Sequence, residues 1–346
     1  MLVSSLGLAG FRGLDDKIYD LEKVNNLIGE NGSGKTSFLE AVYMLCTGVS
    51  FLTTTAETIA NHKSNKFFVE GRLVQKDEVD RLAIKMEQGK KSCYLNNERT
   101  TQGKMLLRHP LCLIDAFVNK VISGGPENRR KTIDRAMFHV EQNYLSEFKA
   151  YNKCLKQRNK ALREKMSAKE IGVWDESLSK HGENITRMRE RHISEIRRPF
   201  EEMSRLFIGK ESKIEFKKGW LGSSLYEELK KNIAKDRILK RTSCGPQKDD
   251  FIISVSGKKA QTHMSHGQEK MLSLSYVFSQ KKCIEKQTNK KTIILFDETD
   301  ACLDEESTDK VINYLKSLNN QILTATHPHS SLHKKLIGKT TILKQS

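Results

Sequence analysis

The octapeptide Gly29-Glu30-Asn31-Gly32-Ser33-Gly34-Lys35-Thr36 decides the fold, because it fits the pattern G-x-x-x-x-G-K-[ST]. Glycines at these positions let successive backbone N–H groups curl around phosphate oxygens, and the Lys35 ammonium adds a positive charge. The Thr36 hydroxyl is the expected Mg²⁺ ligand, and Ser37 continues the chain into the next element. The octapeptide together with Ser37 therefore predicts a loop that binds the phosphates of a nucleotide with Mg²⁺.

The residues on either side of this loop agree with that prediction. Val24–Ile28 is a short apolar strand, and Ser37–Leu45 has the apolar spacing of a helix. A helix that begins at the loop directs its positive N-terminus at the anion. With a strand before and a helix after, a glycine-rich turn that binds nothing is strongly disfavoured.

A second acidic element follows far downstream. Ile293–Phe296 is an apolar run, Asp297 stands at its end, and Glu298 comes next. On its own this pattern is an ordinary strand that ends in an acidic turn. Together with a phosphate-binding loop it predicts that Asp297 holds the metal and that Glu298 is the catalytic base for the attacking water.

His327 follows the next apolar strand, Gln321–Ala325, and directly succeeds Thr326. A lone histidine is usually a surface or packed residue. Here the strand is expected to neighbour the one that carries Asp297, so we favour a catalytic position for His327 beside the terminal phosphate.

A third motif, Ser265-His266-Gly267-Gln268, opens an apolar helix that runs through Val277. Ser265 and Gln268 fit a capping box, and that structural reading explains both residues completely. The functional alternative is a second anion site made by Ser265, Gly267 and the helix N-terminus. One chain would then hold two half-sites, and two chains placed head to tail would complete two whole sites.

The periodicity of the apolar residues divides the chain into three stretches. Strand-like patterns occupy the beginning and the end, and helical patterns lie between them. The expected strands include Phe67–Val74, Arg81–Met86, Tyr94–Leu95, Phe251–Val255, Thr292–Phe296 and Gln321–Thr326. We therefore expect an α/β domain built from residues 1–118 and 240–346, interrupted by a helical insert at residues 119–239.

Two apolar stripes indicate helices within the insert. Tyr144, Phe148 and Tyr151 recur at helical spacing in the first, and Ile193 to Phe207 in the second. Pro199 stands inside the second stripe and is expected to kink or break that helix.

Composition limits the classes of protein that remain. The 346 residues contain 60 Lys+Arg against 43 Asp+Glu, which gives a formal net charge of +17. Such an excess indicates either a self-repelling soluble surface or a footprint for a polyanion. The seven cysteines show no CxxC spacing and no disulfide framework, and no apolar run is long enough for a membrane span. We expect a reduced, cytoplasmic protein without a membrane segment.

Taken together, the motifs resemble the ATP-binding-cassette heads of the SMC type, and within them the RecF family. The resemblance covers nearly the whole chain and implies an α/β ATPase head with a mixed sheet and flanking helices, which carries the helical insert. Beyond the loop and the motifs above, it rests on Gly10-Phe11-Arg12, Gly125-Pro126-Glu127-Asn128-Arg129-Arg130 with Asp134, Leu155-Lys156-Gln157-Arg158-Asn159, Lys218-Gly219-Trp220, and Gly245-Pro246 with Asp250. The Gly-Pro-x-x-Arg-Arg and Gln-Arg-Asn elements are its more specific parts.

The resemblance also implies roles for individual residues. Lys35 and Thr36 would hold ATP and Mg²⁺, Asp297 the metal, and Glu298 the base. Asp304 would lie at the seam of a dimer, where Ser265 with Gly267 and Gln268 would reach the partner's nucleotide, and Arg12 would touch the nucleotide. The glutamine of the loop between the lobes is either Gln75 or Gln102. Arg129 and Arg130 have three readings: a solvated turn, a salt bridge to Asp134, or DNA contact.

As a function, the resemblance implies a weak, DNA-stimulated ATPase with slow hydrolysis. Its ATP-dependent homodimer would bind duplex DNA and single-strand/duplex junctions or gaps, and would act with RecR and possibly RecO in recombinational repair and RecA loading. Two alternatives from other classes are an ATPase subunit of a phage-defence or nuclease complex and a small-molecule P-loop kinase. A kinase would need an acceptor-binding lid and no Ser-x-Gly-Gln element.

Overall fold

A five-stranded parallel sheet forms the centre of the computed structural model, which describes residues 1–53, 55, 58–60, 66–75, 78–297 and 303–343. The strand order is β14-β3-β13-β12-β8, and every neighbouring pair is parallel. The strands are β3 (Val24–Ile28), β8 (Leu111–Ile114), β12 (Ile293–Asp297), β13 (Ile322–Thr326) and β14 (Lys339–Ile342). The sheet thus joins strands from both ends of the chain, as the apolar runs predicted.

Alternate residues of these strands enter two different hydrophobic cores. Leu113 and Leu295 point into the core that contains helix α1 (Lys35–Thr47). Their neighbours Ile114 and Phe296 point into the core that contains helix α9 (His266–Thr288). Because successive side chains of a strand face opposite sides, α1 and α9 cover opposite faces of the parallel sheet.

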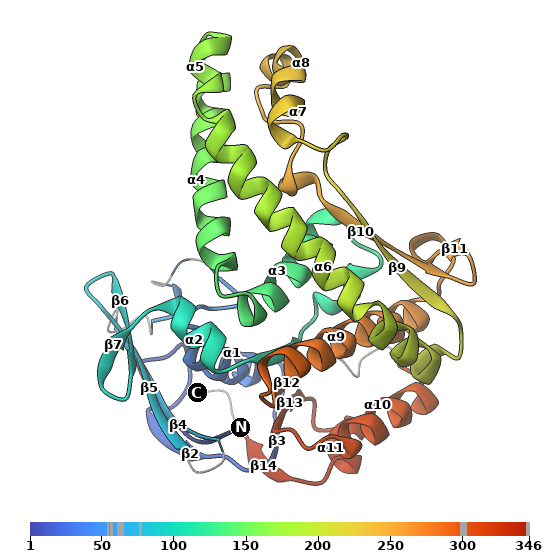
Figure 1. Ribbon diagram of the computed structural model, residues 1–346. Coiled ribbons are helices and arrows are strands. Elements are labelled where there is room, and N and C mark those ends of the chain that lie inside the picture. Colours follow the sequence, from blue (N-terminus) through green and yellow to red (C-terminus); the bar gives the residue numbers. More distant parts are fainter. Residues whose placement is uncertain (54, 56–57, 61–65, 76–77, 298–302, 344–346) are drawn as a thin grey trace.

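A six-stranded antiparallel sheet closes the other side of α1. Its order is β2-β1-β4-β5-β6-β7. The strands are β1 (Leu2–Ala9), β2 (Lys17–Asp20), β4 (Phe67–Gln75), β5 (Glu78–Glu87), β6 (Lys90–Leu95) and β7 (Glu98–Thr100). Residues of β1, β4 and β5 share one core with α1 and the parallel strands. The parallel and antiparallel strands therefore sort into two layers with the loop helix between them (Figure 1).

Further elements surround these layers. A three-stranded antiparallel sheet has the order β11-β10-β9. The elements are β9 (Ser212–Lys217), β10 (Asp250–Val255) and β11 (Lys258–Lys259), helices α2 (Gln102–Arg108), α3 (Pro126–Val140), α10 (Glu305–Ser317) and α11 (Ser331–Lys335), and the 3₁₀ turns η2 (Val118–Val121), η3 (Pro246–Lys248) and η4 (Ala260–Thr262). β9 pairs with β10 although the two belong to different parts of the expected domain division.

Five helices form a projection that rises from the layered base (Figure 1). The helical projection consists of α4 (Tyr144–Arg163), α5 (Ala168–Gly172), α6 (Asp175–Ile208), α7 (Leu225–Lys231) and α8 (Ile233–Leu239). Arg158 of α4 is fully buried and donates hydrogen bonds of 2.7 Å each to Asp175 of α6 and Asp236 of α8. One guanidinium thus joins three helices of the projection.

Of the two outcomes predicted at Pro199, the break is wrong, because α6 continues from Asp175 to Ile208 with the proline inside it, and the kink stays a prediction. Ile196 and Phe200 on either side of the proline are fully buried in the core shared with α9. The burial of this apolar stripe outweighs the roughly 3 kcal/mol that an interior proline costs a helix.

Among the described residues, no helix has the length and apolar character required to cross a membrane.

Candidate nucleotide-binding site

The phosphate-binding loop begins where β3 ends and passes directly into α1, as the sequence predicted. A Cβ added at Gly29 would lie 2.3 Å from Ser33 Oγ and 2.5 Å from the Leu343 carbonyl oxygen. Gly34 has a φ of +91° at the N-cap of α1. Only glycine fits both positions, so the chain keeps its backbone free for a close approach.

The lysine of the loop curls back over its own backbone. Lys35 Nζ donates hydrogen bonds to the carbonyl oxygens of Gly29 at 2.7 Å and Glu30 at 2.9 Å. Lys35 is only 3% exposed, so its ammonium group lies inside the loop. Ser33, also buried, has a hydroxyl without a hydrogen-bond partner in the described part of the chain. Such a cradle suits an anion that accepts several hydrogen bonds.

The two expected metal ligands lie next to each other. Thr36 Oγ1 donates a hydrogen bond of 3.0 Å to Asp297 Oδ1 at the end of β12. A hydroxyl and a carboxylate are hard oxygen donors of the kind that Mg²⁺ prefers, beside phosphate oxygens. Glu298, the expected catalytic base, lies outside the described residues, as does Cys302.

His327 flanks the loop from the neighbouring strand. It follows β13, which lies between β3 and β12 in the sheet, so its expected place beside the strand of Asp297 is confirmed. His327 Nε2 is 3.0 Å from Glu30 Oε2, and both side chains are exposed. The histidine thus faces an acidic residue of the loop, a pairing that the sequence did not reveal.

Arg12 lies against α1. Its guanidinium donates hydrogen bonds of 2.7 and 2.8 Å to the carboxylate of Glu40, which is fully buried. The predicted contact of Arg12 with nucleotide stays a prediction. The sequence analysis assigned no role to Glu40. A charged residue inside the apolar run of residues 38–42 could have indicated a buried carboxylate that needs a cationic partner.

The serine motif forms the capping box at the start of α9. Gln268 N donates to Ser265 Oγ at 3.4 Å, and Ser265 N donates to Gln268 Oε1 at 3.3 Å. Ser265 is exposed and Gly267 partly exposed, so this helix end is open to solvent. Asp304 caps α10 in a similar way, accepting a hydrogen bond of 2.7 Å from Ser307 N, and it is also exposed.

The two arginines of the Gly-Pro-x-x-Arg-Arg element connect α3 to the residues at the start of β10. Arg129 donates hydrogen bonds of 2.6 and 3.1 Å to Asp250, and Arg130 donates one of 2.8 Å to the Asp249 carbonyl oxygen. Asp134 instead pairs with Arg189. The predicted salt bridge to Asp134 is therefore wrong, because Arg129 pairs with Asp250, and the DNA contact stays a prediction. Gln75 ends β4 and Gln102 begins α2, which leaves those two alternatives open.

The comparisons with known proteins agree with this architecture. The family described as "RecF/RecN/SMC N terminal domain" matches residues 2–343. A protein from Pseudoalteromonas translucida described as "DNA replication and repair protein RecF" is 32% identical over 94% of this chain and 92% of its own length. A protein of the same description from Coxiella burnetii is 30% identical over 99% of each chain.

Solved structures show the same fold. The "recombination mediator protein RecF-ATPrS in RecFOR pathway" covers 99% of this chain and 96% of its own with a TM-score of 0.90 and 22% identity. A more distant likeness, with a TM-score of 0.56 and 18% identity, is to an "SmcHead bound to the C-winged helix domain of ScpA". From the family match and the near full-length relatives, the chain belongs to the RecF family, within the wider group of RecF, RecN and SMC N-terminal domains.

Proposed function

We propose that this protein is an ATP-dependent DNA-binding protein of recombinational repair, whose ATP-bound homodimer is the DNA-binding form. Residues 1–118 and 240–346 make the ATPase head, and residues 119–239 make the helical insert. Each head would bind ATP through the loop from Gly29 to Ser37. Its relatives are described as DNA replication and repair proteins, which supports the class of function.

One observation carries the dimer. The loop and the exposed start of α9 belong to helices that cover opposite faces of the same sheet. A helix N-terminus that is open to solvent favours the binding of an anion. In a head-to-tail dimer, Ser265, Gly267 and Gln268 of one subunit would complete the phosphate site of the other, with Asp304 at the seam.

The roles within one head follow from the contacts. Lys35 and the loop N–H groups would bind the phosphates, and Thr36 and Asp297 would hold Mg²⁺. The metal supplies charge neutralisation of the phosphate oxygens during hydrolysis. Glu298 would accept the proton of the attacking water, and His327 would orient groups near the terminal phosphate through its contact with Glu30.

The net charge of +17 supports DNA as the partner of this dimer. Each phosphate that a Lys or Arg neutralises releases counterions, so binding to gapped DNA should weaken steeply as salt rises. Duplex DNA and single-strand/duplex junctions are the substrates we propose, with RecR and RecO as protein partners in the loading of RecA. Hydrolysis would be slow and stimulated by DNA.

Sedimentation of the full chain tests the proposal. With Mg²⁺ and saturating ATP, the Glu298→Gln variant should sediment as a dimer and bind gapped DNA, because the change removes the base but keeps hydrogen-bonding capacity. Lys35→Ala should stay monomeric at the same ATP concentration, and it is the matched control. A Glu298→Gln protein that remains a monomer with ATP, or gapped-DNA affinity that hardly changes with salt, would contradict the proposal.

A further inference from the structure

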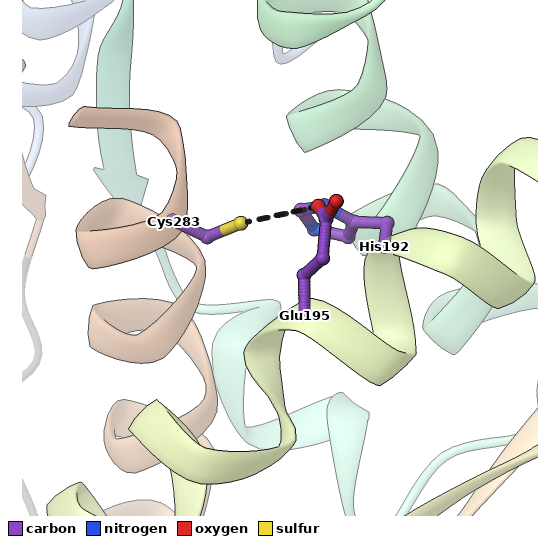
Figure 2. A group of neighbouring side chains, drawn as sticks. All are labelled: His192, Glu195 and Cys283. Atoms are coloured by element: carbon purple, nitrogen blue, oxygen red, sulfur yellow. Dashed lines mark hydrogen bonds between the residues drawn. The ribbon is translucent and has the colours of Figure 1, made fainter. Parts of the chain in front are cut away.

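We propose that His192, Glu195 and Cys283 form a zinc site that joins the long helix of the projection to helix α9. His192 and Glu195 lie on α6, and Cys283 lies on α9. Figure 2 shows the three side chains converging between the two helices. Each offers one ligand atom, and these atoms all lie within 4.8 Å of one another.

The distances suit a tetrahedral ion. Cys283 Sγ is 4.0 Å from His192 Nδ1 and 3.8 Å from Glu195 Oε2. In a tetrahedral zinc site with bonds of about 2.3 Å to sulfur and about 2.0 Å to nitrogen or oxygen, neighbouring ligand atoms lie about 3.6 Å apart. Both observed distances are too long for a strong hydrogen bond. Shifts of a few tenths of an ångström would bring both sulfur pairs to that spacing, and the His192–Glu195 pair, which lies within 4.8 Å, would have to close to about 3.3 Å.

The two buried ligands have little else to bind. His192 is 1% exposed, and its Nε2 has no hydrogen-bond partner within the described residues. Within the described part of the chain, its Nδ1 lies 4.0 Å from the thiol of Cys283, which is itself 5% exposed. A buried nitrogen whose polar contact is a distant thiol is only weakly satisfied, and a metal bond at Nδ1 would replace that contact, with the ring proton on Nε2.

Glu195 is already oriented toward the site. Arg191 Nε donates a hydrogen bond of 3.0 Å to Glu195 Oε1, which leaves Oε2 directed at the thiol, where Gln287 also contacts it. Such outer contacts commonly hold metal ligands in place. The carboxylate is partly exposed, so solvent can supply a water as fourth ligand.

The choice of zinc follows from the donors. One thiolate, one imidazole and one carboxylate form a mixed set that suits Zn²⁺ far better than Mg²⁺ or Ca²⁺. On binding, the Cys283 thiol would release its proton to solvent as the sulfur–zinc bond forms. The charges of Zn²⁺, the thiolate and Glu195 then sum to zero, which suits a site beside the exposed cation Arg191. A bound ion would fix α6 against α9, the helix that Ser265 caps.

Metal binding by the purified full-length chain tests the site. After removal of metal with a chelator, Co²⁺ should bind at one ion per chain with a thiolate-to-cobalt absorption band, and Zn²⁺ should displace it. The band should disappear in Cys283→Ser and persist in Cys154→Ser, a matched change at a half-buried cysteine on α4. Glu195→Gln should weaken Zn²⁺ binding by at least about tenfold, whereas Glu202→Gln, on an exposed position of the same helix, should leave it unchanged.

A second measurement guards against variants that merely fold poorly. Zn²⁺ should raise the melting temperature of the wild-type chain, because an ion that binds only the folded state stabilises it, and this increase should be lost in Glu195→Gln. Wild-type protein without a thiolate band would overturn the proposal. So would a band that survives in Cys283→Ser, or equal zinc affinity in Glu195→Gln and Glu202→Gln.

Discussion

Thr36 and Asp297 are 261 positions apart in the chain, and the Thr36 hydroxyl donates a hydrogen bond of 3.0 Å to the Asp297 carboxylate. The contact joins the first turn of α1 to the tip of β12. It places two oxygen ligands side by side at the carboxyl end of the parallel sheet, where ligands of open α/β sheets bind.

Replacing Asp297 with Asn should separate metal binding from nucleotide binding. The amide can still accept the Thr36 hydrogen bond, but it lacks the charge that attracts Mg²⁺. We expect ATP hydrolysis to fall about 10- to 100-fold or more, while nucleotide binding in EDTA stays near that of the wild type. Turnover assays and nucleotide titrations with Mg²⁺ and with EDTA would measure both effects.

The matched control for this change is Asp309→Asn. Asp309 lies on α10 and pairs with Lys335 at 2.6 Å on the surface, away from the loop. The Asp309→Asn variant should hydrolyse ATP at the wild-type rate. If Asp297→Asn retains the Mg²⁺ dependence of the wild type, Asp297 is not a metal ligand.

The parts of the fold that the sequence predicted are those that depend on local patterns. The strand at Val24–Ile28, the loop after it and the capping box at Ser265 all follow from residue types within a few positions. Apolar runs such as Ile293–Phe296 indicated strands buried on both faces, because a strand covered by α1 and α9 has no polar side.

The parts that could not be predicted depend on pairs of residues far apart in the chain. Nothing near Arg12 indicates that its partner is Glu40, and nothing near Arg129 selects Asp250 over the closer Asp134. The break considered at Pro199 is wrong for the same reason, since the packing that keeps α6 continuous comes from other elements. The motif residue Arg158 likewise gains its structural meaning only when three helices meet around it.

Removing Arg158 should destabilise the helical projection. Arg158→Ala would leave the buried carboxylates of Asp175 and Asp236 without their cation, which costs on the order of 3–5 kcal/mol. We expect faster hydrogen exchange in α4 and α8 and a lower free energy of unfolding, with ATP binding retained. Arg163→Ala, at an exposed position of the same helix, is the control.

A compensated variant tests the cause of that loss. Combining Arg158→Met with Asp175→Asn and Asp236→Asn removes all three charges together, so much of the lost stability should return. If the compensated variant is as unstable as Arg158→Ala, packing rather than unpaired charge explains the effect.

Acidification should destabilise the fold through His139. Burial lowers the pKa of this histidine to about 4, even though its ring bonds the Leu106 carbonyl oxygen at 2.8 Å. Between about pH 6.5 and pH 4 the unfolded chain therefore binds a proton that the folded chain does not. The stability is complete above pH 6.5 and falls as the pH drops through this range, by on the order of 3 kcal/mol for such a shift.

Chemical unfolding at several pH values would measure this slope. His139→Gln should flatten the slope, while His263→Gln, at an exposed position, should leave it as in the wild type. Burial also lowers the pKa of His192 to about 4, so this histidine contributes to the same slope. Because His192 is a proposed zinc ligand, the measurement needs zinc-free buffer. An unchanged slope in His139→Gln would show that His139 is not buried in its neutral form.

Ser265→Asp should distinguish a helix cap from a phosphate contact made across the dimer. Asp and Ser are N-caps of similar strength, so α9 keeps an acceptor for Gln268 N. The added negative charge would repel the terminal phosphate bound by the other subunit. We expect Ser265→Asp to bind ATP as a monomer with wild-type affinity and to dimerise at least about tenfold more weakly, which corresponds to about 1.4 kcal/mol. Ser224→Asp makes the same exchange at the N-cap of α7, where Ser224 accepts from Glu227 N at 3.4 Å, and should dimerise normally. Equal dimerisation of the two variants with ATP would limit Ser265 to its role as the cap of α9.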